Sequence, residues 1–184
     1  MKEQVEIWTR RASKEIADCR VFKVREDFCE RSSDGAKHSF FVIEPPDWVN
    51  VIGLTKNKEV VLIEQYRQGT EEITLEIPGG MIDANEDAAA AAARRELVEE
   101  TGFEAGELIL LGRSRPNPAI QNNWMHHYLA LDCEKTGETA FDEHESLQTK
   151  LVSLSEIENL IASGEISHSL VLAAFYFLKL QKTL

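Results

Sequence analysis

Three glutamates near the middle of the chain are spaced to share one face of a helix. Glu96, Glu99 and Glu100 follow a run of six alanines and two arginines, and Gly102 comes shortly after them. Residues three and four positions apart are neighbours on a helix, so these carboxylates repel one another. Mg²⁺ binds a few carboxylates together with waters and a phosphate. The spacing therefore indicates a magnesium site, with an acidic solvated helix face as the alternative for this short pattern alone.

The element that must position these carboxylates is a helix predicted over residues 88–101. Alanine has the highest helix propensity, and a small side chain lets a helix lie close to a sheet. Glu86 or Asp87 supplies negative charge where it favours a helix N-terminus, and Gly102 suits the position after the last turn. Arg95 stands one position from the carboxylates, so it can reach back to Glu86 or Asp87 and hold the preceding loop against the helix.

Short apolar segments separated by turns predict the sheet on which this helix lies. Residues 19–44 alternate like a β-hairpin that turns at residues 33–35, and Pro45-Pro46 marks a soft boundary after it. Because successive hairpins pair antiparallel strands, they favour a mixed α/β sheet over a doubly wound parallel one. Further strands are expected over residues 49–54, 60–65, 73–77, 108–113, 124–131 and 150–154.

The C-terminal part of the chain predicts two helices. Ser155 and Glu158 have the spacing of a capping box, and Gly164 suits the end of the short helix that follows them. A second helix is expected over residues 169–180. It is apolar nearly all round, which predicts burial in the core or in a subunit interface.

Charge and composition exclude several classes of protein. The net charge of −12 argues against a general nucleic-acid binder, although residues 1–40 hold nine Lys/Arg against eight Asp/Glu. The three cysteines form no CxxC pair, so we expect free thiols, as in a reducing cytoplasm, and no disulfide framework or zinc ribbon. No signal peptide is visible, and the longest apolar run, residues 170–178, is too short to span a membrane. The sequence predicts a cytoplasmic protein with no nucleic-acid or membrane partner.

The carboxylates belong to a longer string of residues. Gly80, Glu86 and the segment Arg95-Glu96-Leu97-Val98-Glu99-Glu100-Thr101-Gly102 resemble the Nudix box, whose pattern is G-x5-E-x7-R-E-U-x-E-E-x-G-U with U aliphatic. The chain departs from this pattern at one point, because eight residues instead of seven separate Glu86 from Arg95. Either the start of the helix holds one extra residue, or Asp87 takes the acidic role with Met81 at the first glycine position.

The resemblance implies a fold, a metal and an activity. The fold is an α/β/α sandwich with a mixed sheet, and the activity is hydrolysis of nucleoside diphosphates linked to another moiety. The implied cofactor is Mg²⁺, with Mn²⁺ as a substitute, because a divalent cation neutralises the diphosphate and orients the attacking water. A backbone carbonyl at the glycines of the box completes the metal shell. The metal and catalytic residues implied within the box are Gly79, Arg95, Glu96, Glu99 and Glu100.

Segments outside the box resemble the ADP-ribose pyrophosphatase subgroup. VLIEQYR, residues 61–67, and EIPGG, residues 76–80, match patterns of that subgroup. Its members have a β-rich N-terminal lobe, expected here over residues 1–45 before a Nudix domain over residues 46–184, and are typically homodimers that exchange contacts through these lobes. For Glu76 an ion pair with Arg67 is an equal alternative to a ligand contact. The substrate-binding residues implied are Trp8, Arg25, Arg67, Glu76, Gly80, Met81 and Asn117.

Two further segments bear on the base and on the substrate. In the subgroup, a loop with an E-x-E supplies a late metal ligand and the general base, and Glu143 and Glu145 align with it as base and metal ligand. The segment SRPNPAIQNNWMHHYLALD, residues 114–132, departs from the subgroup, so a hexose is an alternative to ribose as the terminal sugar. Of His126 and His127, one must point inward as a satisfied core histidine.

The sequence predicts a Mg²⁺-dependent enzyme that cleaves ADP-ribose or a related nucleoside diphosphate sugar, such as GDP-mannose or ADP-glucose. The products are a nucleoside monophosphate and a sugar phosphate. Two alternatives stay open, a nucleoside triphosphate sanitising pyrophosphatase and a non-catalytic nucleotide-sugar sensor. The N-terminal lobe disfavours the first, and the presence of all three box carboxylates disfavours the second.

Overall fold

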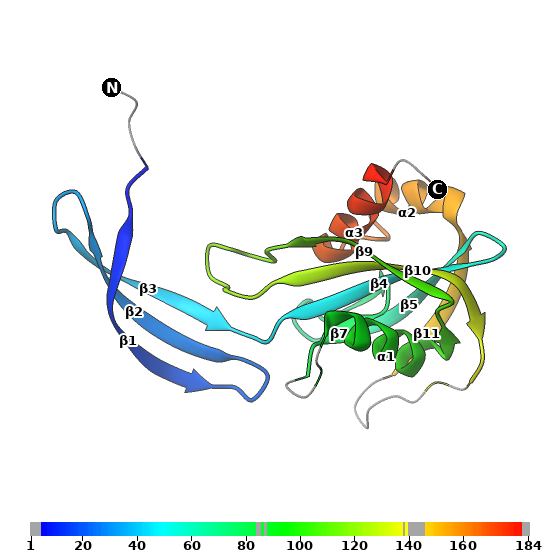
Figure 1. Cartoon of the computed structure of the whole chain (residues 1–184), viewed down its shortest axis with the longest axis horizontal. Helices are drawn as coiled ribbons and strands as arrows, with labels where there is room; N and C mark the ends of the chain where they lie inside the picture. The colour runs from blue at the N-terminus through cyan, green and yellow to red at the C-terminus, as the bar shows by residue number, and fades with distance from the viewer. Residues whose placement is uncertain (1–4, 84–85, 87, 138, 140–145, 182–184) are drawn as a thin grey trace. The chain divides into compact units, whose positions relative to one another are not determined.

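The chain folds into two compact units. The computed structural model describes residues 5–83, 86, 88–137, 139 and 146–181 (Figure 1). The first unit comprises Met1–Pro46 together with Arg115–Asn123, and the second comprises Asp47–Ser114 together with Trp124–Leu184. Because a loop from the middle of the chain belongs with the N-terminal strands, the first unit is discontinuous in sequence.

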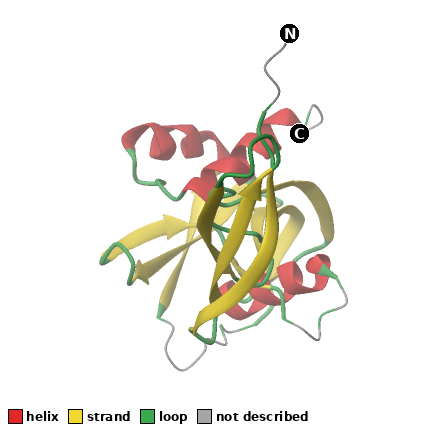
Figure 2. Ribbon diagram, turned by 90° about the vertical axis from the view of Figure 1, so that its left-hand side faces the viewer, coloured by secondary structure: helices red, strands yellow, loops and turns green. Residues whose placement is uncertain are grey.

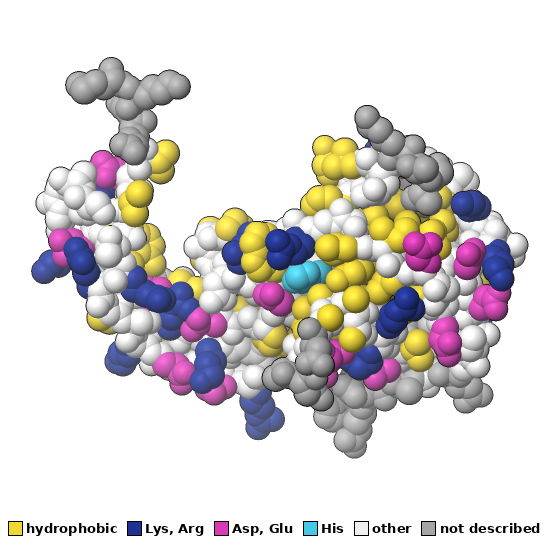
Figure 3. Space-filling view, in the orientation of Figure 1, with side chains coloured by type: hydrophobic (Ala, Val, Ile, Leu, Met, Phe, Trp, Pro, Cys, Tyr) yellow, Lys and Arg dark blue, Asp and Glu magenta, His cyan; other side chains and the backbone are white. Residues whose placement is uncertain are grey.

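The first unit is a three-stranded antiparallel sheet in the order β1-β2-β3. Strands β2 (Lys23–Arg31) and β3 (Lys37–Glu44) form the predicted hairpin, and Gly35 adopts the left-handed conformation (φ 72°) that its turn requires. The sequence did not predict β1 (Trp8–Asp18), because most of its residues are exposed and the apolar alternation that marks a half-buried strand is absent. Lys/Arg and Asp/Glu side chains are interspersed on this unit (Figure 3).

The loop 115–123 packs against β3 within the first unit. Ile43 and Gln121 form an isolated β-bridge, and the backbone N–H of Ile43 donates to the carbonyl of Ile120 at 2.8 Å. The side-chain amide of Asn122 donates to the Glu44 carboxylate at 3.0 Å. The loop is therefore an added edge of the small sheet.

The second unit contains an eight-stranded mixed sheet in the order β11-β5-β4-β10-β8, with β6 on β5, β7 on β4 and β9 on β10. Strand β4 (Trp48–Thr55) runs parallel to β10 (Met125–Lys135), and the other pairs are antiparallel, so the expected mixed sheet is confirmed. The remaining strands are β5 (Glu59–Arg67), β6 (Glu72–Glu76), β7 (Gly79–Met81), β8 (Phe103–Glu104), β9 (Glu107–Ser114) and β11 (Leu147–Ser153).

Helices cover both faces of this sheet, as the expected α/β/α sandwich requires. Helix α1 (Ala89–Thr101) lies on one face, and α2 (Ile157–Ser163) and α3 (Ser169–Leu180) lie on the other (Figure 2). Alternate residues of β4 divide between the faces: Val49 and Val51 join the cluster with α1, and Ile52 and Leu54 join the cluster with α3. This two-sided burial explains why the strand is a nearly continuous apolar run, interrupted by the buried Asn50.

Of the two expectations for the C-terminal helices, the first is wrong and the second is confirmed. The Ser155 capping box does not form, because a 3₁₀ turn, η1 (Leu154–Glu156), leads directly into α2, and the Ser155 hydroxyl lies 2.9 Å from that of Ser153. Helix α3 has the predicted bounds and is packed in the core through Leu170, Val171, Ala174, Phe175 and Leu178, while Tyr176 on its other side is 64% exposed. None of the helices in the described part of the chain is both long and apolar enough to cross a bilayer.

His127 is the inward-pointing histidine, and its hydrogen bonds fix its tautomer. The imidazole is fully buried, with Nδ1 2.8 Å from Asn50 Oδ1 and Nε2 2.8 Å from the Ser114 hydroxyl. The Asn50 amide nitrogen donates to the Leu170 carbonyl at 3.0 Å, so Oδ1 must be the acceptor and His127 Nδ1 carries the proton. This chain of bonds links β9, β10, β4 and the start of α3.

Acid is expected to destabilise the fold through His127. Burial, with a smaller contribution from His126, lowers the pKa of His127 to about 4. Since the unfolded chain binds the proton near pH 6.5, the stabilisation is complete above that pH and is lost as pH falls towards 4. Urea unfolding should show a loss of about 2 kcal/mol between pH 7 and pH 5 from this group. His127→Gln should be less stable at pH 7 and lose less on acidification; an unchanged loss would exclude His127 as the cause.

Candidate metal-binding and catalytic site

Arg95 gathers the loop before α1 and two of the predicted carboxylates. Its guanidinium donates to Glu86 at 3.0 Å, to Glu96 and Glu99 at 2.9 Å each, and to the Met81 carbonyl at 3.0 Å. Hydrogen bonds from Arg95 also lower the pKa of Glu86, so that carboxylate stays ionised. Of the two partners that the sequence left open for Arg95, Glu86 is contacted, and Asp87 lies outside the described residues.

Helix α1 holds these carboxylates because its other face is anchored. Ala92, Ala93 and Leu97 are fully buried against the sheet, and Leu97 lies over Gly53, where a Cβ atom would approach its side chain to 3.3 Å. Gly102 ends the helix in the left-handed conformation (φ 72°) and donates its N–H to the Val98 carbonyl, as the sequence predicted.

Glu100 and the two glycines of β7 fit closely together. Glu100 is only 4% exposed, and its Oε2 accepts a hydrogen bond from the Gly79 N–H at 2.9 Å. A Cβ atom on Gly80 would lie 2.3 Å from Glu96 Oε1, so only glycine leaves room for that carboxylate. Strand β7 pairs with β4, which fixes both glycines relative to the sheet.

The donor set fits a hard divalent cation. Within the described ranges, no group of three or more His, Cys, Asp or Glu side chains converges as a metal site. Instead Glu96 and Glu99 bind Arg95, and Glu100 binds Gly79. Three carboxylates on one helix face beside backbone carbonyls are nevertheless the oxygen ligands that Mg²⁺ and Mn²⁺ take.

Arg67 and Glu76 form an ion pair, one of the two alternatives left open by the sequence. The Glu76 carboxylate is 2% exposed and accepts two hydrogen bonds of 2.8 Å from Arg67, which keeps 41% of its own side chain exposed. His168 Nδ1 also lies 2.8 Å from this carboxylate. Although burial raises the pKa of Glu76, the hydrogen bonds from Arg67 and His168 outweigh it and hold that pKa well below its usual range. No sequence pattern indicated a role for His168.

The other predicted residues lie elsewhere. Trp8 packs edge-on against Phe40, with ring centroids 5.4 Å apart, and Arg25 pairs with Asp27 at 2.9 Å. Both belong to the first unit, as does Asn117, whereas the box carboxylates belong to the second. The predicted base and late metal ligand, Glu143 and Glu145, lie outside the described residues.

The chain is similar to a protein family and to several proteins of known description. The NUDIX domain family profile matches residues 45–175. The chain is 31% identical over 173 residues to the methanol dehydrogenase activator of Bacillus methanolicus, covering 94% of this chain and 92% of that protein. It is 27% identical over 144 residues to the ADP-ribose pyrophosphatase of Bacillus subtilis, covering 78% and 77%.

A solved structure described as an ADP compounds hydrolase has the same fold. It superposes with a TM-score of 0.84 at 24% sequence identity, covering 96% of this chain and 95% of that chain. The profile match over residues 45–175, most of the chain, establishes that the protein belongs to the Nudix family.

Proposed function

We propose that this protein hydrolyses the diphosphate linkage of ADP-ribose or a related nucleoside diphosphate sugar to a nucleoside monophosphate and a sugar phosphate. The observation that carries the proposal is the Arg95 cluster, in which one guanidinium holds Glu96 and Glu99 beside the Glu100–Gly79 contact. The similarity to an ADP-ribose pyrophosphatase over most of the chain supports the choice of substrate class.

Glu96, Glu99 and Glu100, with the Gly79 carbonyl and Glu145, are the residues that would hold Mg²⁺ or Mn²⁺. When bound, such a cation neutralises the diphosphate and acidifies a water molecule. Arg95 orients two of the carboxylates, because its hydrogen bonds hold them on one side of α1. Glu143 would accept the proton of the attacking water, with Glu99 beside the reacting phosphate.

The remaining proposed contacts are to the substrate itself. Arg67 donates from Nε and Nη2 to the buried Glu76, and 41% of its side chain remains exposed, so the ion pair would place its positive charge near a phosphate or ribose oxygen. Gly80 and Met81 lie on β7 next to the carboxylates and would contact the diphosphate through their backbone. Trp8, Arg25 and Asn117 are the proposed contacts from the first unit.

We propose that the protein acts as a homodimer through its N-terminal lobe, residues 1–45, which make up most of the first unit. Ile16, Val21 and Phe41 of this unit are each about half exposed, at 49%, 52% and 56%, in a sheet without a helix among its described residues. A second copy covering these apolar side chains would stabilise the small sheet. Light scattering of the purified chain measures its oligomeric state directly.

We propose a cytoplasmic location for the protein. The cysteines Cys19, Cys29 and Cys133 are free, which suits a reducing cytoplasm.

The test is product analysis with purified protein and Mg²⁺. The substrates are ADP-ribose, GDP-mannose, ADP-glucose and a nucleoside triphosphate, each with an EDTA-treated control. We expect a nucleoside monophosphate and a sugar phosphate from at least one diphosphate sugar, and no product after metal removal. Cleavage of the triphosphate alone would support a sanitising pyrophosphatase. Thermal stabilisation by a nucleotide sugar without cleavage would support a sensor.

A second candidate function is activation of a methanol dehydrogenase. It is favoured by the Bacillus methanolicus relative, which is named for that effect and matches nearly the whole of both chains. Adding the purified protein to such a dehydrogenase with its substrates tests it, and unchanged turnover would exclude it.

A further inference from the structure

The carboxylate of Glu76 is held from β5, β6 and the start of α3. Its Oε1 accepts from Arg67 Nε at 2.8 Å and from the Thr74 hydroxyl at 2.6 Å. Its Oε2 accepts from Arg67 Nη2 at 2.8 Å and lies 2.8 Å from Nδ1 of His168, the residue just before α3. Because an ionised carboxylate only accepts hydrogen bonds, His168 Nδ1 carries a proton and donates it to this bond. Both oxygens of Glu76 are thus fixed, and we call these four residues the Glu76 cluster.

The Glu76 cluster lies close along the chain to the glycines of the proposed metal site. Glu76 ends β6, and Gly79 begins β7 three residues later. Between them the Pro78 carbonyl accepts from the Val51 N–H at 2.9 Å, which fixes this connection against β4. Three residues of extended chain span at most about 11 Å, which limits the distance between the Cα atoms of Glu76 and Gly79. The charge of Arg67 therefore acts on a diphosphate held beside Gly79, since charges interact over about 10 Å in dilute salt.

His168 begins α3, but its side chain does not cap the helix. Its backbone carbonyl accepts from the N–H groups of Val171 and Leu172 at 3.0 Å each, so it is the N-cap residue. Ser, Thr, Asp and Asn stabilise this position, because their side-chain oxygens accept from the first N–H groups of a helix. The His168 side chain makes no such bond and contacts Glu76 instead. A residue that is poor for the helix and contacts a buried carboxylate indicates a role other than helix stability.

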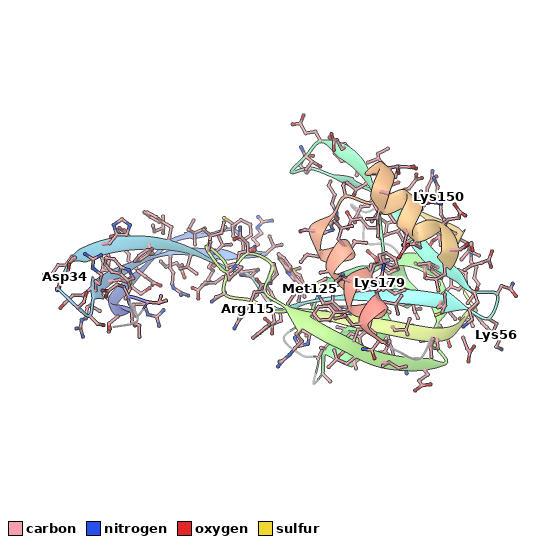
Figure 4. All side chains as sticks on the ribbon, turned by 90° about the horizontal axis from the view of Figure 1, so that it is seen from above. Asp34, Lys56, Arg115, Met125, Lys150 and Lys179 are labelled. Carbon is pink, nitrogen blue, oxygen red and sulfur yellow. The ribbon has the colours of Figure 1, made fainter. Side chains whose placement is uncertain are left out.

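Helix α3 holds His168 in a defined position. Its buried side chains pack against the sheet in one of the two core clusters. Near its other end Lys179, which is labelled in Figure 4, pairs with Glu158 of α2 at 2.8 Å. The core therefore sets the position of His168, and the contact with Glu76 relates that position to Arg67.

The members of the Glu76 cluster differ in their exposure. The side chain of Glu76 is only 3% exposed, whereas that of Arg67 is 41% exposed and that of His168 is 38% exposed. Glu76 is thus a buried connection, and Arg67 is the member that the sequence predicts to contact the substrate. A long arginine side chain loses conformational freedom when it binds a ligand, and a carboxylate that already fixes it reduces this loss. The orientation of Glu76 should therefore affect how tightly substrate binds.

We infer that His168 is a positioning residue for Arg67, and that it raises the affinity for the diphosphate of the substrate by fixing Glu76. The inference rests on the proposed hydrolase function, in which Arg67 contacts the substrate. His168 acts through Glu76 and not by touching the substrate or the metal ligands of the box. Its loss should therefore change KM and leave kcat nearly unchanged.

His168→Ser separates positioning from stability. Serine removes the donor to Glu76, but its hydroxyl can cap α3, so one stabilising contact replaces another. We expect a melting temperature within about 3 °C of wild type. KM for ADP-ribose with Mg²⁺ should rise about tenfold, and kcat should change less than twofold.

The matched control is Val171→Ala, three residues further along α3. Val171 is 1% exposed in the core cluster and makes none of the contacts of Glu76 described above, so this variant loosens the helix without removing a donor. It should lower the melting temperature by about 5 °C and leave KM unchanged. A rise of KM in Val171→Ala equal to that in His168→Ser would overturn the inference, because loss of stability would then explain both.

A double-mutant cycle with Arg67→Lys tests whether His168 acts through Arg67. Lysine keeps a positive charge beside Glu76 but lacks the planar group that the carboxylate orients. Binding of ADP-ribose is measured by calorimetry in EDTA, so that no turnover occurs. His168→Ser should weaken binding about tenfold in the wild-type background and less than twofold in the Arg67→Lys background. Equal effects in the two backgrounds would overturn the inference.

The same calorimetry distinguishes this inference from the proposed function. Wild type that binds ADP-ribose without cleaving it would overturn the hydrolase function, and weaker binding by His168→Ser would still support the positioning role. Wild type that cleaves ADP-ribose, with the same KM and the same affinity in His168→Ser, would overturn the positioning role alone.

Discussion

Glu100→Gln is expected to lower kcat for diphosphate-sugar hydrolysis about 10³-fold while the protein stays folded. The amide keeps an oxygen that can accept from the Gly79 N–H, so the contact that holds β7 against α1 survives. It loses the negative charge that a divalent cation requires, and this charge is buried, with only 4% of Glu100 exposed. Steady-state kinetics over a range of Mg²⁺ concentrations measures the effect.

The matched control for this variant is Glu104→Gln. Glu104 lies on β8, four residues further along the chain, and is exposed, with its carboxylate accepting from the Thr136 hydroxyl. The same loss of one charge there should leave kcat within a factor of two. If both variants lost activity equally, the effect of Glu100 would be one of overall charge and not of a metal ligand.

Alanine substitutions at Gly80 and Gly79 are expected to have different effects, the first on catalysis and the second on the stability of the fold. On Gly80 a Cβ would meet the end of the flexible Glu96 side chain at 2.3 Å, so the carboxylate must move away while the backbone stays in place. Gly80→Ala should therefore lower kcat about 100-fold with a nearly unchanged melting temperature. On Gly79 the Cβ would meet the Val49 carbonyl oxygen at 2.4 Å and the Asn50 Cα at 2.8 Å.

Neither of the groups that a Cβ on Gly79 would meet can rotate away, because both are backbone atoms of a buried strand. Gly79→Ala should thus cost about 2 kcal/mol of stability and lower the melting temperature by about 5 °C. Thermal unfolding and kinetics of the two variants, measured side by side, test this contrast. A stable Gly79→Ala protein, or a Gly80→Ala protein with full activity, would contradict the close packing of β7 between β4 and α1.

Local sequence patterns were sufficient to predict the helix that carries the carboxylates. The alanine run and Gly102 placed α1 to within one residue of its observed start, and α3 has the predicted bounds. Strand β1 was missed because a strand with both faces exposed has no apolar period to detect. The capping box predicted at Ser155 does not form. The spacing of Ser155 and Glu158 is the same whether the residues before the helix are extended or form a 3₁₀ turn, and here they form a 3₁₀ turn.

Contacts between distant residues account for what the sequence left open. The spacing of the box allowed two acidic partners for Arg95, and only the path of the loop decides that Glu86 is in reach. Likewise Asp47 and His126 are far apart in the chain, and they meet because β4 and β10 run parallel. The roles of Glu143 and Glu145 stay predictions.

The placement of loop 115–123 restricts how this protein can be recombined. Because the loop is an added edge of the small sheet, the N-terminal unit is assembled from two separate stretches of chain. A chimaera that exchanges only residues 1–46 with a relative would set foreign strand residues against the native Gln121 and Asn122. Transfer of the whole unit to another protein therefore requires that residues 115–123, between β9 and β10, are transferred together with residues 1–46. Substitutions in one of these two segments should be accompanied by substitutions in the other during evolution.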